Sequence, residues 1–366
     1  LQYVNKLYPT ITAVEKQLLV NRLLMSTANI LYDEYGVAYS PRKQGAGMSS
    51  LADAVATPAY LYVRGIDKTK IELGDDAQKT GVYTLRFVVK NLTGAALRYE
   101  INTTVQTETT GDDALYIVQA GHTLSPESET IRVSGGQLDG KTVTVPAHGE
   151  TGITVTVKLS DADRAYLEQF PNGIYVEGFV ELTAQDNPSL SIPFLGFYGD
   201  WGKAPILEDA DIYNGKDVKM FATAPSGIYA MMYIFRLGTY PFVIPEGYDA
   251  PAVSADHISL DLGGGNGISN LYYLQAGMLR GAKNADVVIR DEDTGEIYAQ
   301  WNELNVRKAM YNASTGQVRA GLVGEIWPPL SGGSSVGLIP NNTHMVYDAT
   351  LYVDGYDSSD NVNNHY

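Results

Sequence analysis

Cysteine is absent from this 366-residue chain, so disulfides contribute nothing to its stability. A chain without cysteine is compatible with the cytosol or with the exterior of a Gram-positive bacterium. Long apolar runs are also missing: none approaches the roughly 18 residues of a membrane-spanning helix, so no membrane span is expected. Leu1 to Val4 show neither the basic start nor the apolar stretch of a signal peptide. Because natural proteins rarely begin without Met and inside a helix, we expect a fragment.

Positive charge is scarce. The chain has 26 Lys and Arg residues against 42 Asp and Glu residues, which gives a net charge of −16. Few cations are available to neutralise phosphates, so no nucleic-acid partner is expected. The apolar fraction of 44% and the charged fraction of 19% are typical of a globular protein. The length predicts two or three domains.

Residues 1–57 have a helical pattern. Thr12 and Glu15 form a predicted capping box, in which each side chain satisfies a free amide at the helix start. Behind it, Val14, Leu18 and Leu23 place an apolar stripe on one side of the helix. A second short helix is predicted from Ser49 or Ser50 to Val55, ending before Pro58.

From Tyr60 onward the apolar period changes to two, which indicates β-strands. Strands with one solvent-exposed face are predicted at residues 83–90 and 153–158, and another strand follows the Pro171-Asn172-Gly173 turn. Further strands are predicted at 287–289, 297–301 and 345–353, with a hairpin turn at Asp293-Thr294-Gly295. Short strands separated by turns, with no comparable helix between them, predict antiparallel sandwiches. The pattern loosens around residues 201–217, where we place a domain boundary.

Five segments carry a family resemblance: LLMSTA (23–28), SPRKQGAG (40–47), LADAV (51–55), PNGIYVEGFVEL (171–182) and IPFLGFYGDW (192–201). Together they resemble the end of the catalytic domain and the fibronectin-type-III-like neighbour of cell-envelope subtilisin-family serine peptidases, the lactocepin-like subtilases. The resemblance implies a mainly β fold with a helical remnant of a subtilisin-like α/β catalytic domain at 1–57. Two antiparallel fibronectin-type-III-like β-sandwiches would follow, at 58–203 and 204–366.

The SPRKQGAG segment has two interpretations. It lacks the full glycine-loop pattern of a phosphate site, because Lys43 precedes the glycines. A structural junction is favoured: glycines permit tight turns, and Arg42 can fork across nearby carbonyls. IPFLGFYGDW is interpreted as a buried strand with an inter-domain plug, and a carbohydrate-stacking or peptide-binding surface is the alternative. The predicted structural-junction residues are Arg42, Gln44, Gly45, Gly47, Phe197 and Trp201.

No catalytic, cofactor-binding or metal-binding residue is assigned. The family's nucleophile lies in a G-T-S-M motif that this chain lacks, so no catalytic residue can be carried over. The histidines occupy turn-like or strand-edge contexts and are interpreted as surface residues: His122, His148, His257, His344 and His365. Acidic clusters suggest a weak calcium hypothesis, but none has the spacing of a calcium-binding loop. The clusters are Asp75-Asp76, Asp112-Asp113, Asp291 to Glu296, and Asp354 with Asp357 and Asp360.

The resemblance implies a noncatalytic accessory region of an extracellular serine endopeptidase, at the cell wall or secreted. It would brace the catalytic domain and contribute to recognition of protein or peptide substrates, with the upstream catalytic half as its partner. The chain alone should be inactive. The alternative is a stand-alone bacterial surface adhesin or glycan-binding module, motivated by 26 tyrosines and by Trp201, Trp301 and Trp327.

Overall fold

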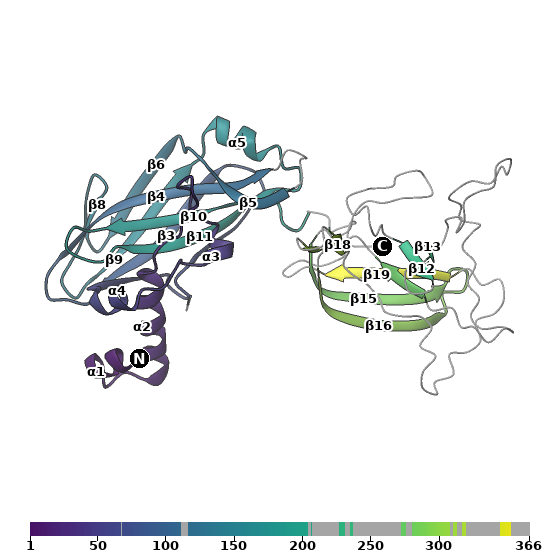
Figure 1. Ribbon diagram of the computed structural model, residues 1–366, viewed down its shortest axis with the longest axis horizontal. Coiled ribbons are helices and arrows are strands. Elements are labelled where there is room, and N and C mark those ends of the chain that lie inside the picture. The colour runs from purple at the N-terminus through teal and green to yellow at the C-terminus, as the bar shows by residue number, and fades with distance from the viewer. Residues whose placement is uncertain are drawn as a thin grey trace. The chain divides into compact units, whose positions relative to one another are not determined.

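The computed structural model divides into two compact units, Leu1–Trp201 and Gly202–Tyr366 (Figure 1). It describes residues 1–66, 68–110, 116–203, 206, 227–230, 235–236, 272–275, 280–307, 310–312, 317–319 and 345–352. Strands predominate and helices are few, so the predicted mainly β fold is confirmed. Within the described residues, no helix combines the length and apolarity that crossing a membrane requires.

The first unit opens with four helices: α1 (Gln2–Leu7), α2 (Ala13–Ser26), α3 (Pro41–Gln44) and α4 (Leu51–Ala56). The predicted capping box at α2 is present, because the Thr12 hydroxyl accepts from the Glu15 amide while the Glu15 carboxylate accepts from the Thr12 amide. Ser50 caps α4 by accepting from the Asp53 amide at 3.2 Å. Helices this short depend mainly on packing for their stability.

A four-stranded antiparallel sheet follows, in the order β1-β3-β9-β6. Its strands are β1 (Ala59–Tyr62), β3 (Val82–Asn91), β9 (Glu150–Lys158) and β6 (Ser128–Ser134). The alternation predicted for β3 and β9 is observed, with Leu85, Phe87 and Val155 buried. Val88 was predicted to lie on the solvent-exposed face of β3. It is instead only 4% exposed, and it pairs in register with Tyr62 of β1.

The second sheet has seven strands, in the order β2-β11-β10-β4-β8-β7, with β5 also paired to β4. Its strands are β2 (Ile71–Asp76), β11 (Leu190–Tyr198), β10 (Ile174–Thr183), β4 (Leu97–Thr110), β8 (Thr142–Val145), β7 (Gln137–Asp139) and β5 (Tyr116–Thr123). The β2–β11 pair is parallel and the other pairs are antiparallel. The sheet is therefore mixed at this edge.

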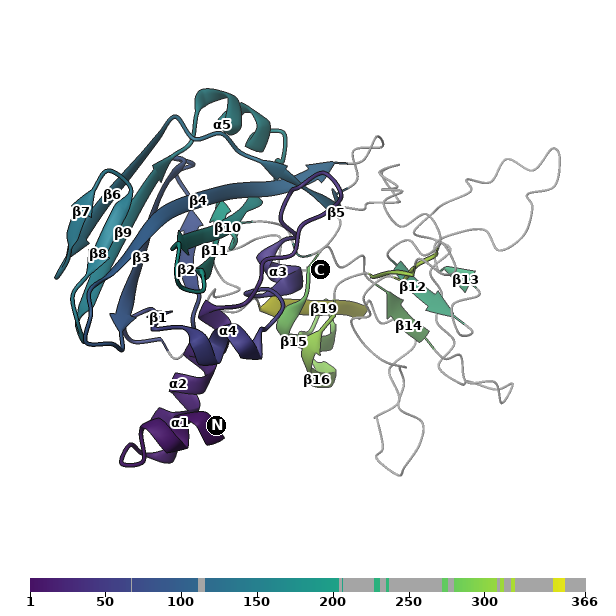
Figure 2. The ribbon, with the colours of Figure 1, turned by 60° about the vertical axis from the view of Figure 1, so that its left-hand side comes forward.

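The two sheets face one another across a single apolar core (Figure 2). The smaller sheet contributes side chains such as Leu85 and Val155, and the larger sheet contributes Ile101, Val176 and Val180. Each is essentially fully buried. Full burial of such a side chain stabilises the fold by about 1.5–3 kcal/mol, so this interior is the main source of the unit's stability.

The larger sheet is covered on its outer face as well. Along β10 the core-facing residues alternate with Tyr175, Glu177 and Phe179, and Glu177 and Phe179 are also buried. The cover comes from the N-terminal segment, because α2 and α3 both contact this sheet. A sandwich sheet with one solvated face would show polar residues at these positions. β10 is instead enclosed on both sides.

A short helix, α5 (Asp161–Leu167), interrupts the strands of the first unit between β9 and β10. The sequence prediction missed it, although Ser160 and Asp163 form a capping box. Seven residues are too few to show the apolar period of a surface helix clearly. The helix is anchored by Leu167, which is fully buried in the sandwich core.

The second unit contains the predicted hairpin. β15 (Ala282–Asp291) pairs with β16 (Ile297–Val306) and with β19 (Met345–Tyr352), both antiparallel. Smaller sheets are formed by β12 (Gly227–Ala230), β13 (Phe235–Arg236) and β14 (Tyr272–Gln275), and by β17 (Met310–Asn312) and β18 (Gln317–Arg319). The division into domains at 1–57, 58–203 and 204–366 stays a prediction.

Candidate functional site

The SPRKQGAG segment lies on the outer face of the larger sheet, where it forms α3 and the turn behind it. The Ser40 hydroxyl accepts from the Arg42 amide at 3.1 Å, and Pro41 occupies the first helical position. Both features favour a helix start. The single turn of α3 directs the Arg42 side chain onto β10 and β4.

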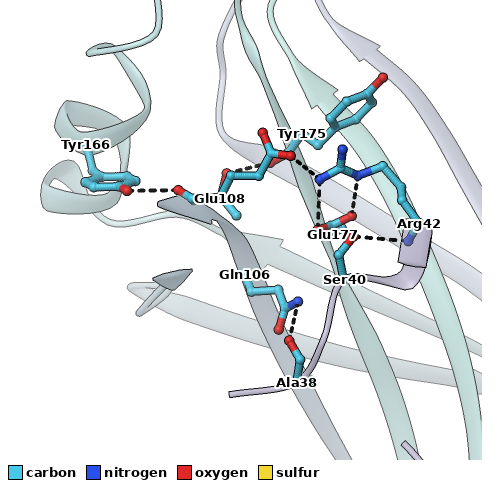
Figure 3. A network of polar contacts seen from close by, with 9 residues as sticks. Ala38, Ser40, Arg42, Gln106, Glu108, Tyr166, Tyr175 and Glu177 are labelled. Atoms are coloured by element: carbon cyan, nitrogen blue, oxygen red, sulfur yellow. Dashed lines mark hydrogen bonds and ion pairs between the residues drawn. The ribbon is translucent and has the colours of Figure 1, made fainter. Parts of the chain in front are cut away.

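Arg42 binds two carboxylates on neighbouring strands (Figure 3). Its Nε donates to Glu177 Oε2 at 2.9 Å and its Nη2 to Glu177 Oε1 at 3.3 Å, while Nη2 also donates to Glu108 Oε1 at 2.5 Å. The side chains of Glu177 and Glu108 are only 1% and 10% exposed, and that of Arg42 is 24% exposed. The sequence predicted carbonyl acceptors for this guanidinium, and the acceptors are carboxylates instead.

The charges of this group support one another. Burial lowers the pKa of the Arg42 guanidinium, but its contacts with Glu177 and then with Glu108 more than offset that effect, so the net pKa is raised. The Arg42 cation faces two carboxylates. The carboxylate of Glu177 is almost completely buried, so its charged form depends on this partner for stability. The arrangement fits a permanent structural ion pair better than an acid or base that must change its protonation state.

An aromatic cluster continues from Arg42. The guanidinium carbon lies 4.1 Å from the centre of the Tyr175 ring, which is a cation–π contact. Tyr175 in turn contacts Phe197 and Trp201 at ring-centre distances of 5.4 and 5.7 Å. Three of the predicted junction residues therefore meet around Tyr175. Tyr175 was not among the residues predicted from the sequence, although its position two residues before Glu177 places both on the same face of β10.

The network reaches further along β4. The Glu108 carbonyl accepts from the Tyr166 hydroxyl of α5 at 2.8 Å, and His122 of β5 stacks on the Tyr166 ring at 3.9 Å. On the other side, the Gln106 side chain donates to the Ala38 carbonyl at 2.9 Å (Figure 3). These contacts join α5, β5 and the segment at Ala38 through β4.

Gln44 fixes the loop that precedes α3. Its Nε2 donates to the Leu31 carbonyl at 3.1 Å and to the Tyr39 carbonyl at 2.6 Å, and its Oε1 accepts from the Leu31 amide at 2.8 Å. A single side chain thereby closes residues 31–39 into a hairpin-like loop. This requires an amide that both donates and accepts, which glutamine provides.

The two glycines of the predicted junction, Gly45 and Gly47, have different constraints. Gly45 ends α3 with φ = +64°, and an added Cβ there would meet open space. Gly47 has φ = +115°, and an added Cβ would overlap the carbonyl oxygen of Asn29. Asn29 and Met48 exchange two backbone hydrogen bonds of 2.8 Å at this point. Gly47 therefore permits the close approach that pairs these two segments.

The acidic clusters within the described residues have protein partners. Asp291 accepts from the amides of Asp293 and Thr294 at 2.8 Å, as in a turn, and Asp75 accepts from the Trp201 amide at 2.8 Å. In the part of the chain that the structure describes, no group of three or more His, Asp or Glu side chains could hold a metal ion. The clusters at Asp112-Asp113 and Asp354 to Asp360 lie outside the described residues.

The remaining candidate side chains are dispersed. His148 lies in a tight turn with φ = +51°. Trp201 packs against Tyr175 and Phe197, and Trp301 belongs to β16. His257, His344, His365 and Trp327 lie outside the described residues.

Comparisons with known proteins agree with the resemblance seen in the sequence. A family model described as an Fn3-like domain matches residues 71–195. C5a peptidase from Streptococcus pyogenes serotype M18 (strain MGAS8232) is 31% identical over 213 residues, which cover 57% of this chain and 17% of that protein. The PI-type proteinase of Lactococcus lactis subsp. cremoris is 27% identical over 311 residues, which cover 80% of this chain and 15% of that protein.

This chain therefore contains an Fn3-like domain and is homologous to accessory regions of subtilisin-family cell-envelope proteinases, as predicted. It spans only about a sixth of the length of these relatives: 17% of C5a peptidase and 15% of the PI-type proteinase. Among solved structures, the class 5 fimbriae chaperone CfaA is 8% identical with a TM-score of 0.27, covering 81% of this chain and 99% of that chain. A likeness this low supports no conclusion.

Proposed function

We propose that this chain is a noncatalytic accessory region of an extracellular subtilisin-like serine endopeptidase. In this role it braces the catalytic domain and contributes to recognition of protein or peptide substrates. The observation that carries the proposal is the Arg42–Glu177 ion pair, because it ties the SPRKQGAG segment to the central strand of the Fn3-like domain. The homology to cell-envelope proteinases supplies the biological context, including a location at the cell wall or outside the cell.

A bracing domain must hold its neighbour in a fixed position, and the first unit has contacts that fix its helices against the sandwich. α2 is tied to β1 through Ser26, whose hydroxyl accepts from the Leu61 amide at 2.8 Å and donates to the Leu61 carbonyl at 3.3 Å. Ser26 is fully buried. A second apolar cluster of Val4, Leu19, Leu23 and Ala54 joins the helices, and Tyr60 of β1 packs against it. A domain attached to these helices would be held in a fixed orientation relative to the sandwich.

The helical segment also has the exposed apolar surface that such a neighbour would cover. Seven of the thirteen large apolar side chains that are exposed among the described residues lie within residues 1–30 and 40–57. Several are on the helices themselves: Tyr3, Leu7, Val14, Leu51 and Val55. Monomeric proteins rarely concentrate exposed apolar side chains in this way unless another surface covers them.

The test compares this chain with the product of the reading frame that encodes it. We expect a fluorophosphonate probe, which labels activated serines, to leave the 366-residue chain unlabelled and to label the product of a frame carrying an upstream G-T-S-M motif. In that longer protein, Arg42→Met should lower the temperature at which labelling is lost, while Arg64→Met should not. Stoichiometric labelling of this chain alone, or a reading frame without a peptidase domain, would contradict the proposal.

A further inference from the structure

We propose that residues 31–39, here called the tyrosine loop, bind a separate polypeptide that presents arginine or lysine next to apolar side chains. This interaction surface goes beyond the accessory role proposed above and does not depend on it. Its basis is a loop that is rigidly built and yet leaves large apolar side chains in solvent.

The loop is closed by its own hydrogen bonds. The Asp33 amide donates to the Val37 carbonyl at 2.9 Å, and the Tyr39 amide donates to the Leu31 carbonyl at 2.9 Å. Inside the turn, Asp33 Oδ1 accepts from the amides of Tyr35 and Val37, both at 2.9 Å. Gly36 supplies φ = +79° at the tip. The backbone conformation is therefore fixed without any ligand.

The loop is also fastened to the rest of the unit. Gln44 holds both of its ends, as described above, and Gln106 holds Ala38 from the sheet side. Ala38 is 3% exposed, and the Tyr32 hydroxyl hydrogen-bonds Glu181 of β10. A surface fixed in this way loses little conformational entropy when it binds, which favours affinity.

The side chains that the loop presents are apolar and mostly aromatic. Tyr35 at the tip is 80% exposed, and Tyr32, Tyr39 and Leu31 are 49%, 41% and 37% exposed. Folding has therefore left these side chains in water although the backbone beneath them is ordered. Tyrosine gives a large amphipathic contact area with few rotatable bonds, and it is enriched in binding surfaces for that reason.

Charge complementarity identifies the partner as cationic. Residues 31–39 contain Asp33 and Glu34 and no Lys or Arg, and Glu181 lies beside Tyr32. Arg42, which follows the loop, already faces Glu177 and Glu108. Exposed tyrosine rings next to carboxylates suit a guanidinium or ammonium group, which gains a cation–π contact and an ion pair together. Apolar neighbours in the partner would cover Leu31 and the remaining ring surface.

The experiment uses the whole 366-residue chain and a fluorescein-labelled peptide of repeated Arg-Leu-Gly units, with binding followed by fluorescence anisotropy. A matched peptide carries Gln in place of every Arg. We expect the arginine peptide to bind more tightly than its glutamine counterpart, and its binding to weaken with added salt. Tyr35→Ser should weaken binding by about tenfold, the loss expected for an aromatic anchor.

Matched variants separate the loop from general stickiness and charge. Tyr3→Ser removes another exposed tyrosine, in α1, and should leave binding unchanged. Glu34→Lys should weaken binding, whereas Asp139→Lys in the edge strand β7 should not. Because Tyr35 and Glu34 are exposed, circular dichroism and the melting temperature should match those of the unaltered chain.

Three results would overturn the proposal. One is the absence of measurable binding to the arginine peptide, and another is equal binding by the Tyr35→Ser variant or by the glutamine peptide. The third is concentration-dependent dimerisation in sedimentation that Tyr35→Ser abolishes, because the loop would then be a contact between copies of this chain. None of these results bears on the probe-labelling test of the proposed function.

Discussion

At the scale of single residues, Arg42 makes a set of contacts that lysine could not make. Its guanidinium reaches two oxygens of Glu177 and one of Glu108, and its planar face lies over Tyr175. An ammonium group is a compact point charge, so it cannot make the paired contact and the ring contact together. The choice of arginine at this position follows from the geometry of β10 and β4.

Removing Arg42 should leave the carboxylate of Glu177 buried without its cation. We expect Arg42→Met to lower the free energy of unfolding by about 3 kcal/mol, since breaking a buried pair from one side is strongly destabilising. Arg42→Lys should cost less. Urea denaturation of the 366-residue chain, followed by the fluorescence of its tryptophans, gives the measurement.

Arg64 provides the control for this prediction. It pairs with Glu150 at 3.3 Å, but its side chain is 68% exposed, so Arg64→Met should change stability by less than about 1 kcal/mol. Adding Glu177→Gln to Arg42→Met should recover part of the loss, because the unpaired charge is then gone. Equal effects of Arg42→Met and Arg64→Met on the free energy of unfolding would show that the buried Glu177 contact stabilises the fold no more than an exposed ion pair does.

At the scale of elements, the segment from Asn29 to Met48 owes its shape to three glycines, Gly36, Gly45 and Gly47. All three have positive φ, but only Gly47 also sits against another backbone segment. The bridge between Asn29 and Met48 brings the start and end of this segment together. α3 and the tyrosine loop are both positioned by that closure.

Alanine substitutions should distinguish Gly45 from Gly47. Gly45→Ala should cost about 1–3 kcal/mol, because φ = +64° with ψ = −126° is a backbone region that residues with a Cβ rarely adopt, although the new Cβ would meet open space. Gly47→Ala should cost about 3 kcal/mol or more, because backbone strain is added to overlap with the Asn29 carbonyl. The shift of the urea midpoint for each variant measures these costs, and a Gly47→Ala variant no less stable than Gly45→Ala would contradict the close approach.

At the scale of the whole molecule, the sequence predicted what depends on local pattern. The alternation of β3 and β9, the capping box of α2 and the hairpin near Gly295 are all short-range signals, and the structure contains each of them. Contacts between distant segments were predicted less well. The SPRKQGAG segment was predicted to be a structural junction with carbonyl acceptors, but its carboxylate acceptors lie 66 and 135 residues further along the chain.

Contacts between distant segments were predicted less well because no periodic pattern in the sequence encodes them. Glu177 and Phe179 read as outward positions of an antiparallel strand, and only the N-terminal segment folded over them makes them buried. The parallel pairing of β2 with β11 is likewise a matter of topology. The available signal was a glutamate within the largely apolar residues 174–180, because an ionised side chain in such a strand is rarely buried without a cationic partner.

We expect the helices and the sandwich of the first unit to unfold together. Leu23 and Val14 lie on the same helix, but Leu23 is 5% exposed and Val14 is 68% exposed. Leu23→Ala should therefore cost about 2–5 kcal/mol, whereas Val14→Ala should be nearly neutral. Because Ser26 and Arg42 tie the helical segment to both sheets, we expect Leu23→Ala to speed hydrogen exchange in α2 and in β10 alike. Exchange that rises in α2 while β10 stays protected would mean that residues 1–57 open as a separate unit, and the region would then lack the rigidity that the proposed bracing role requires.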